Sequence, residues 1–120
     1  MKIKIIPVTP FQQNCSLLIC ETSSKAAVVD PGGELDKIIA VASEHEVEIE
    51  KIFVSHAHID HAGGVAELAE RLDIPIEGPH REDQFWIDML AEQAASFGFP
   101  AARAFEPQRW LEQGDTVKFG

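Results

Sequence analysis

Apolar residues form short alternating or continuous runs in the parts of the chain where strands are expected. These runs are bounded by Pro, Gly, Ser and Thr, which favour turns. The pattern predicts short strands at residues 2–8, 14–21, 26–29, 51–55, 73–76 and 116–119. The last of these strands is expected to follow a turn at residues 112–115.

Three other segments have apolar residues at the three- and four-residue spacing of an amphipathic helix. The first predicted helix covers residues 35–46, and the second is marked by Val65, Leu68, Ala69 and Leu72. The third covers residues 82–97, with an expected buried stripe of Phe85, Met89, Leu90 and Phe97. Strands that alternate with helices indicate an α/β fold, and no linker or repeat divides residues 1–120 into more than one domain.

The chain is acidic, with 20 Asp and Glu against 10 Lys and Arg, and its net charge at pH 7 is −10. A surface that binds nucleic acid needs an excess of Lys and Arg, so we expect no nucleic-acid partner. No apolar stretch reaches the length of a membrane-spanning helix, and the N-terminus lacks the apolar core of a signal peptide. We therefore expect no membrane partner and a cytoplasmic location.

The two cysteines, Cys15 and Cys20, fall in one predicted strand. Residues five apart in a strand point to opposite faces, so we expect no disulfide between them. Buried, reduced thiols are typical of a cytoplasmic protein.

Four side chains of types that bind metals follow the strand at residues 51–55, namely His56, His58, Asp60 and His61. In an extended segment His56 and His58 point to the same side, so they can hold one ion. Asp60 and His61 lie where the chain turns toward a helix, so we expect them to hold a second ion about 3.5–4 Å from the first. The alternative is a polar loop in which the histidines are solvated and Asp60 only caps the next helix.

The run His56-Ala57-His58-Ile59-Asp60-His61 resembles the His-x-His-x-Asp-His signature of the metallo-β-lactamase superfamily. The upstream segment, residues 27–33, is similar to the strand of that superfamily that ends in Asp-Pro-Gly. Similarity to the short, single-domain glyoxalase II-like (hydroxyacylglutathione hydrolase-like) branch extends over residues 6–16, 77–79, 83–86 and 109–115. The resemblance thus covers the whole chain, and it implies an α/β (α+β layered) fold of the αββα sandwich type.

Members of this branch are metal-dependent hydrolases of thioesters such as S-D-lactoylglutathione. The resemblance therefore implies two divalent metal ions, with zinc expected and iron or manganese as alternatives. Hydroxide formed at the ions would attack the thioester carbonyl, and Asp60 would orient the attacking water. The family also includes lactonases, sulfur dioxygenases and phosphodiesterases, which the ligand run does not separate.

This chain resembles only the N-terminal half of such a hydrolase. By resemblance, three further ligands lie in the missing half: a third His for the first metal, an Asp that bridges both metals and a last His for the second. Because a catalytic zinc normally has three protein ligands, we expect the 120 residues alone to be inactive. A non-catalytic alternative is a half-domain that binds metal or forms a homo-oligomer through the sheet face it leaves exposed.

Asp30 has two interpretations. In the family the matching Asp lies near the metal histidines, so Asp30 is a candidate for orienting an imidazole from outside the ligand set. It can also serve only the turn that continues through Pro31-Gly32-Gly33. We expect Gly63 and Gly64 to allow close packing of the backbone beside the ligand loop.

Overall fold

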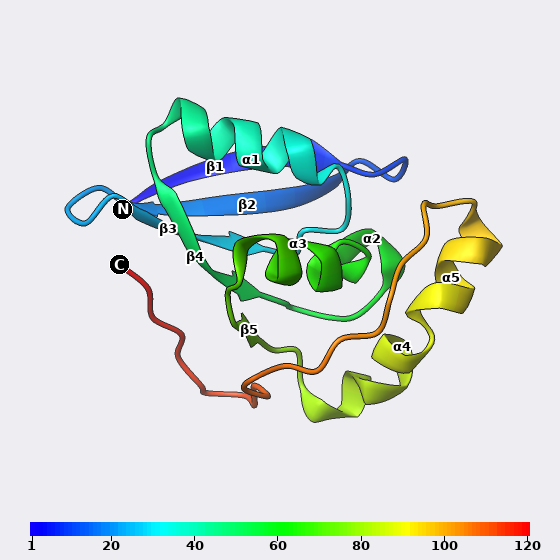
Figure 1. The fold of residues 1–120 in the computed structure, drawn as a ribbon. Coiled ribbons are helices and arrows are strands. Elements are labelled where there is room, and N and C mark those ends of the chain that lie inside the picture. Colours follow the sequence, from blue (N-terminus) through cyan, green and yellow to red (C-terminus); the bar gives the residue numbers. More distant parts are fainter.

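A five-stranded mixed sheet carries helices on one of its faces (Figure 1). The computed structural model describes residues 1–120. The strands lie in sequence order across the sheet: β1 (Lys2–Val8), β2 (Gln13–Cys20), β3 (Lys25–Val29), β4 (Glu48–Phe53) and β5 (Ile76–Glu77). Strands β1, β2 and β3 pair antiparallel, whereas β3, β4 and β5 pair parallel. The carboxyl ends of β3, β4 and β5 therefore meet at one edge of the sheet.

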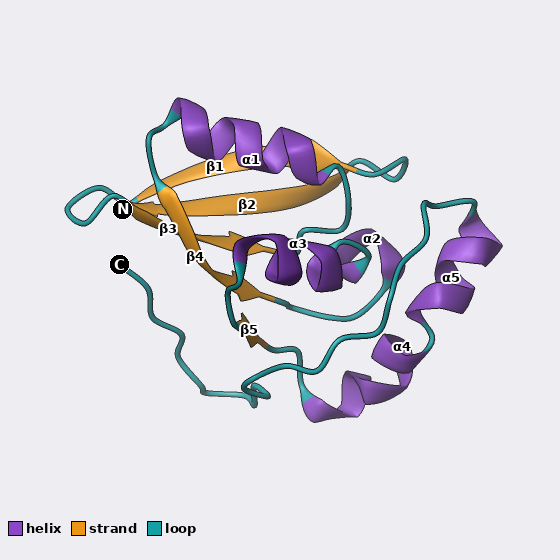
Figure 2. Cartoon of the chain, viewed as in Figure 1, coloured by secondary structure: helices purple, strands orange, loops and turns teal.

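Helices make the crossovers between the parallel strands (Figure 2). Helix α1 (Leu35–Glu44) joins β3 to β4, while α2 (Ile59–Ala62) and α3 (Val65–Leu72) join β4 to β5. The chain then continues through the 3-10 helix η1 (Arg81–Asp83), α4 (Gln84–Asp88) and α5 (Leu90–Phe97). The parallel half of the sheet needs these helices, because a parallel connection cannot be closed by a tight turn.

One apolar core lies between the sheet and the helices. It is formed by side chains that alternate along the strands and by the inner faces of the helices, including Val8, Leu17, Val28, Ile38, Ile52, Leu68, Ile87 and Leu90. Cys15 belongs to this core, and Cys20 is only partly buried; both are free thiols, as expected. The expectation that both would be buried is correct for Cys15 alone.

The opposite face of the sheet has no helical layer. Ile3 and Ile5 of β1 point to this side and are 52% and 54% exposed. Phe53 is buried on it because the C-terminal segment returns across β4, where the rings of Phe53 and Phe119 lie 6.4 Å apart. The two termini finish close together in Figure 1. One sheet with helices on a single face is the arrangement expected for half of an αββα sandwich.

The helix predicted at residues 82–97 is wrong as a single element. Met89 has φ −97° and ψ 5°, which interrupts the helix and separates α4 from α5. The buried residues are Ile87, Leu90 and Ala94, whereas Phe85 and Phe97 are exposed. The interruption turns α5 relative to α4, so a stripe drawn through both helices does not follow one face.

The strand predicted at residues 116–119 is also absent. This segment is held by side chains: Arg109 Nη1 donates to Thr116 O at 2.9 Å, and Gly120 N donates to Glu50 Oε1 at 2.6 Å. Such contacts replace the ladder of backbone hydrogen bonds that a strand requires. The other boundaries shift by a few residues; β4 begins before the expected strand and ends before Ser55, and β5 is shorter than expected.

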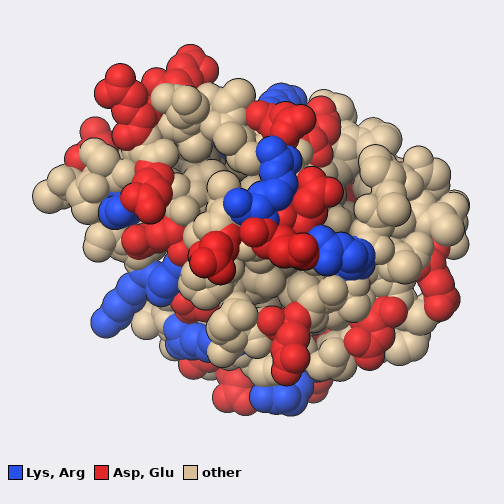
Figure 3. Space-filling model, in the orientation of Figure 1, with Lys and Arg blue, Asp and Glu red and all other residues tan.

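Acidic and basic side chains are interspersed over the helical face in Figure 3, without a basic patch on that side. None of the helices combines the length and the apolar character needed to cross a bilayer.

Candidate metal centre

The site forms where β3 and β4 end side by side. Val29 pairs with Phe53 in the parallel ladder, and Asp30 N donates to Phe53 O at 2.9 Å. The residues that follow the two strands, Asp30 and Ser55, therefore lie next to each other. Parallel pairing thus brings two separate sequence motifs to one edge of the sheet.

The ligand loop, residues 56–61, alternates between buried and outward-facing residues. Ala57 and Ile59 are 0% and 2% exposed and pack into the core. His58, between them, is exposed, and His56 is partly buried. An extended loop with two buried anchors presents both imidazoles on the outer side, as the spacing predicted.

Asp30 is a buried carboxylate, 5% exposed, that makes two contacts with Ser55 and one with the ligand loop. Its Oδ1 accepts from Ser55 N at 2.7 Å, and its Oδ2 accepts from the Ser55 hydroxyl. The same Oδ2 lies 3.0 Å from His61 Nδ1. Asp30 has a positive φ of 56°, an uncommon backbone conformation that Asp tolerates better than most residues. All three contacts of the carboxylate are to residues outside its own turn, so Asp30 does not serve that turn alone.

These contacts determine which ring nitrogens are free. With its proton donated from Nδ1 to Asp30, His61 keeps the lone pair on Nε2. His56 Nδ1 lies 3.1 Å from Ser55 Oγ, whose own proton is donated to Asp30, so this oxygen accepts from His56. Both imidazoles thus present Nε2 as the acceptor, the nitrogen left to bind a metal.

His56 has a pKa below the ordinary value for an imidazole. Burial is the main cause, and the positive charge of a protonated His61 adds to it, while Asp30 opposes it. The neutral imidazole is the form that binds a metal, so this shift favours the binding form at neutral pH.

The four candidate ligands are brought together on one side of the loop. The ring of His56 lies 5.2 Å from that of His58 and 3.8 Å from that of His61. Asp60 Oδ2 is 3.4 Å from His61 Nε2. Asp60 does not cap the short helix α2, which begins at Ile59 and has no side-chain cap, so that part of the polar-loop alternative is wrong.

The donor set fits transition metals such as zinc or iron in chemistry, since it offers imidazole nitrogens and a carboxylate. No three His, Cys, Asp or Glu side chains are arranged so that they could hold one ion. The four candidate ligands therefore form an incomplete donor set, since a catalytic zinc normally has three protein ligands.

Glycines allow the turn after β3 to pack directly on the ligand loop. A Cβ atom on Gly32 would lie 1.8 Å from Asp60 O, and one on Gly64 would lie 2.6 Å from Pro31 O. Gly63 is similarly enclosed, because a Cβ atom there would lie 2.7 Å from Gly32 O. The packing role expected for Gly63 and Gly64 agrees with these contacts, which keep the Asp30 turn in place against the loop.

Sequence reasoning missed several polar residues around the loop. Ser55 directly precedes His56, and this position is the only feature of the sequence that could have pointed to its role. Asp83 Oδ2 accepts from Ala57 N, and Gln93 Oε1 accepts from Ile59 N, each at 3.0 Å. The indole of Trp86 stands edge-on to His58 at 5.0 Å. Nothing in the spacing of Gln93 distinguishes it from a solvated helix residue.

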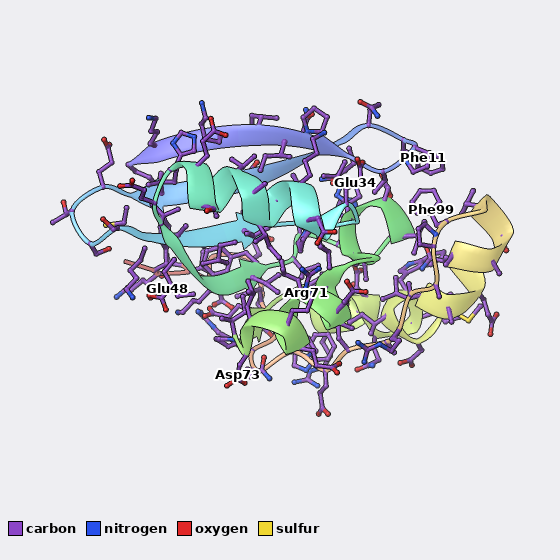
Figure 4. All side chains as sticks on the ribbon, turned by 45° about the horizontal axis from the view of Figure 1, so that its top comes forward. Phe11, Glu34, Glu48, Arg71, Asp73 and Phe99 are labelled. Atoms are coloured by element: carbon purple, nitrogen blue, oxygen red, sulfur yellow. The ribbon has the colours of Figure 1, made fainter.

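One hollow beside the ligand loop is not formed by the candidate ligands. A cavity of about 540 Å³ lies between the β1–β2 turn, the glycine turns and the segment after α5. Figure 4 shows Phe11, Glu34 and Phe99 gathered at this end of the molecule. None of the candidate ligands lines this cavity. The candidate metal site therefore remains the histidine loop.

Comparisons with known proteins place this geometry in a family. The family model described as the metallo-beta-lactamase superfamily matches residues 8–120. Hydroxyacylglutathione hydrolase GloC of Haemophilus influenzae is 41% identical over 119 residues, which cover 98% of this chain and 56% of that protein. The chain thus spans about half the length of this relative.

Two solved structures are similar over nearly the whole chain. The protein TTHA1623, solved in a di-iron-bound form, is 29% identical with a TM-score of 0.83, covering 95% of this chain and 56% of that one. The BLEG-1 B3 metallo-beta-lactamase is 26% identical with a TM-score of 0.82, covering 99% and 57%. The predicted fold class, and the similarity to one half of such proteins, are confirmed.

Proposed function

This chain belongs to the metallo-beta-lactamase superfamily, and on that basis we propose that it supplies the N-terminal half of the metal site of a thioester hydrolase. The observation that carries this proposal is the loop on which His56, His58 and His61 lie together, with two of the three imidazoles fixed by hydrogen bonds. Such preorganised imidazoles are typical of a metal site and have no evident use in a solvated loop.

In the proposed site, His56 and His58 hold one divalent ion, and Asp60 and His61 hold a second. Zinc is the expected metal, with iron or manganese as alternatives. When bound, such ions lower the pKa of water and polarise the carbonyl oxygen of a substrate.

The residues of this chain prepare the site before any ion binds. Asp30 holds the Nδ1 proton of His61 directly and that of His56 through Ser55, which keeps both Nε2 atoms available. Asp60 presents a carboxylate beside His61 Nε2, where it can accept a hydrogen bond from a water molecule and orient it. Asp60 is therefore the candidate catalytic residue.

The proposed substrate class is a thioester such as S-D-lactoylglutathione. It is supported by the relative named hydroxyacylglutathione hydrolase, at 41% identity over nearly all of this chain. The free thiols Cys15 and Cys20 also fit a cytoplasmic enzyme, because the cytoplasm is a reducing compartment.

The test is complementation, since each ion receives only two ligands from this chain. The chain is mixed with a polypeptide that carries the remaining part of the Haemophilus influenzae relative, and hydrolysis of S-D-lactoylglutathione is followed. We expect activity only in the mixture with zinc present, and its loss in the Asp60→Asn variant. A lactone and a phosphodiester are assayed in parallel, and preferential hydrolysis of either would contradict the thioester proposal.

A second candidate function is self-association without catalysis. The uncovered sheet face, on which Ile3 and Ile5 are more than half exposed, favours it because such apolar area tends to be buried against a partner. Sedimentation velocity over a range of chain concentrations tests this candidate. A dimer that is lost in the Ile5→Lys variant supports it, and a monomer at all concentrations contradicts it.

A further inference from the structure

Two polar side chains, one from η1 and one from α5, hold the backbone of the ligand loop by hydrogen bonds. Asp83 Oδ2 accepts a hydrogen bond from Ala57 N at 3.0 Å. Gln93 Oε1 accepts from Ile59 N at 3.0 Å, and its Nε2 donates to Ala57 O at 3.4 Å. Ala57 and Ile59 directly follow His56 and His58, so the peptide groups next to both imidazoles are fixed.

These contacts provide the hydrogen bonds that the loop backbone lacks. No backbone carbonyl accepts from the N–H groups of Ala57 or Ile59. A buried N–H group without a partner is costly, and here two side chains from more than twenty-five positions away meet this need. The extended form of the loop, in which His56 and His58 share one side, is therefore held by tertiary contacts.

Gln93 also connects the loop to the aromatic residue beside it. Its Nε2 donates to Trp86 O at 3.1 Å, and the indole of Trp86 meets His58 edge-on at 5.0 Å with an interplanar angle of 88°. One side chain thus contacts the peptide groups on both sides of His58 and the residue whose ring limits the movement of that imidazole.

We propose that Asp83 and Gln93 are positioning residues for the His56–His58 pair. They hold the loop in the form that presents both imidazoles to one ion, so the metal affinity depends on them although neither touches the metal. A loop without these contacts would lose backbone freedom when it bound the ion, and binding would be weaker. The inference rests on the proposed function, because it requires that His56 and His58 bind an ion.

The variants are chosen to remove hydrogen bonds and to leave the packing as unchanged as the chain allows. Gln93→Met keeps the length of the side chain without its amide, and Asp83→Ala removes the carboxylate. Asp83→Asn retains an oxygen that can accept from Ala57 N and serves as the conservative variant. Gln84→Met and Asp88→Ala are matched controls from α4, because Gln84 and Asp88 are exposed and form a hydrogen bond with each other at 3.1 Å.

Two measurements are made on the full chain. Amide hydrogen exchange by NMR in the metal-free chain is expected to accelerate about tenfold or more at Ala57 in Asp83→Ala and at Ile59 in Gln93→Met. Zinc affinity, measured by competition with a chelator, is expected to fall about tenfold in both variants. The control variants and Asp83→Asn are expected to remain near the wild type in both measurements.

The outcomes separate this inference from the proposed function. A wild-type chain that binds no zinc overturns the proposed function and this inference with it. If the wild type binds zinc and both variants bind it equally tightly, this inference alone is overturned. A lower unfolding temperature with unchanged zinc affinity likewise shows a purely structural role for Asp83 and Gln93.

Discussion

Asp30 Oδ2 lies 3.0 Å from His61 Nδ1, although the two residues are 31 positions apart in the chain. The contact exists because β3 and β4 are parallel neighbours, so the turn after one strand meets the loop after the other. A carboxylate that accepts the Nδ1 proton of a metal-binding His fixes its ring orientation and makes it a better ligand. This relationship connects the fold to the proposed chemistry.

Replacement of Asp30 by Asn should weaken metal binding and leave the fold largely unchanged. In Asp30→Asn the amide oxygen can still accept from Ser55 N, but the charge that favours the Nδ1 proton of His61 is gone. We expect zinc affinity to fall about tenfold or more, measured by chelator competition. Asp36→Asn is the control, because Asp36 is an exposed carboxylate paired only with Arg71. Equal zinc affinity in the Asp30 variant and this control would refute the role of Asp30.

Gly32→Ala should destabilise the chain, because the new Cβ would lie 1.8 Å from Asp60 O. The turn or the ligand loop must move, and we expect a loss of about 2–3 kcal/mol in the free energy of unfolding, measured with urea. Gly33→Ala is the matched control, since its Cβ would meet only Thr9 Cγ2 at 3.3 Å. Similar losses in both variants would show that the close approach of the two loops is not the cause.

The two thiols should differ in reactivity. Burial, together with the negative charge of Asp30, raises the pKa of Cys15 to about 12, whereas hydrogen bonds to Ser23 lower the pKa of Cys20. The thiolate is the reactive form, so a disulfide reagent at pH 8 should modify Cys20 quickly and Cys15 only after unfolding. The Cys20→Ser variant should show no fast reaction. A fast reaction in that variant would mean that Cys15 is accessible in the folded chain.

The metal-free chain should lose stability as the pH falls below about 6.5, the ordinary pKa of His. The pKa of His56 is lowered in the folded chain, so between that lowered value and the ordinary one the unfolded chain binds more protons. Stability therefore rises with pH in this window and falls on acidification through it. Urea unfolding with a chelator present, at pH 7.5 and pH 5.5, should show a smaller difference for His56→Gln than for the wild type. An equal or larger difference would contradict the assignment to His56.

Much of the fold follows from local pattern, and the errors have physical causes. The strands β1 to β3 and the helices α1 and α3 have clear periodicity, and the sequence places them nearly as the structure does. The break at Met89 comes from backbone geometry that the apolar spacing does not reveal. The strand expected at residues 116–119 has the composition of a strand but finds no ladder partner among these residues.

The ligand loop was predictable, but the residues that support it were less so. His56, His58, Asp60 and His61 are close in sequence, so their spacing alone brings them together. Asp30 was a candidate through the family resemblance, and its contact with His61 depends on strand pairing. Gln93 reaches the loop from 34 positions away through α5, and no periodicity or motif marks a contact of that kind.

The central claim is that the loop binds metal through His56 and His58. Elemental analysis of the purified chain, dialysed against zinc, tests it beside the His56→Ala/His58→Ala variant. His45→Ala/His80→Ala is the matched control, since neither of those residues belongs to the loop. We expect about one equivalent of zinc or more in the wild type and in the control, and loss of at least one equivalent in the loop variant. Less than about a tenth of an equivalent in the wild type, or equal zinc in all three chains, would contradict the claim.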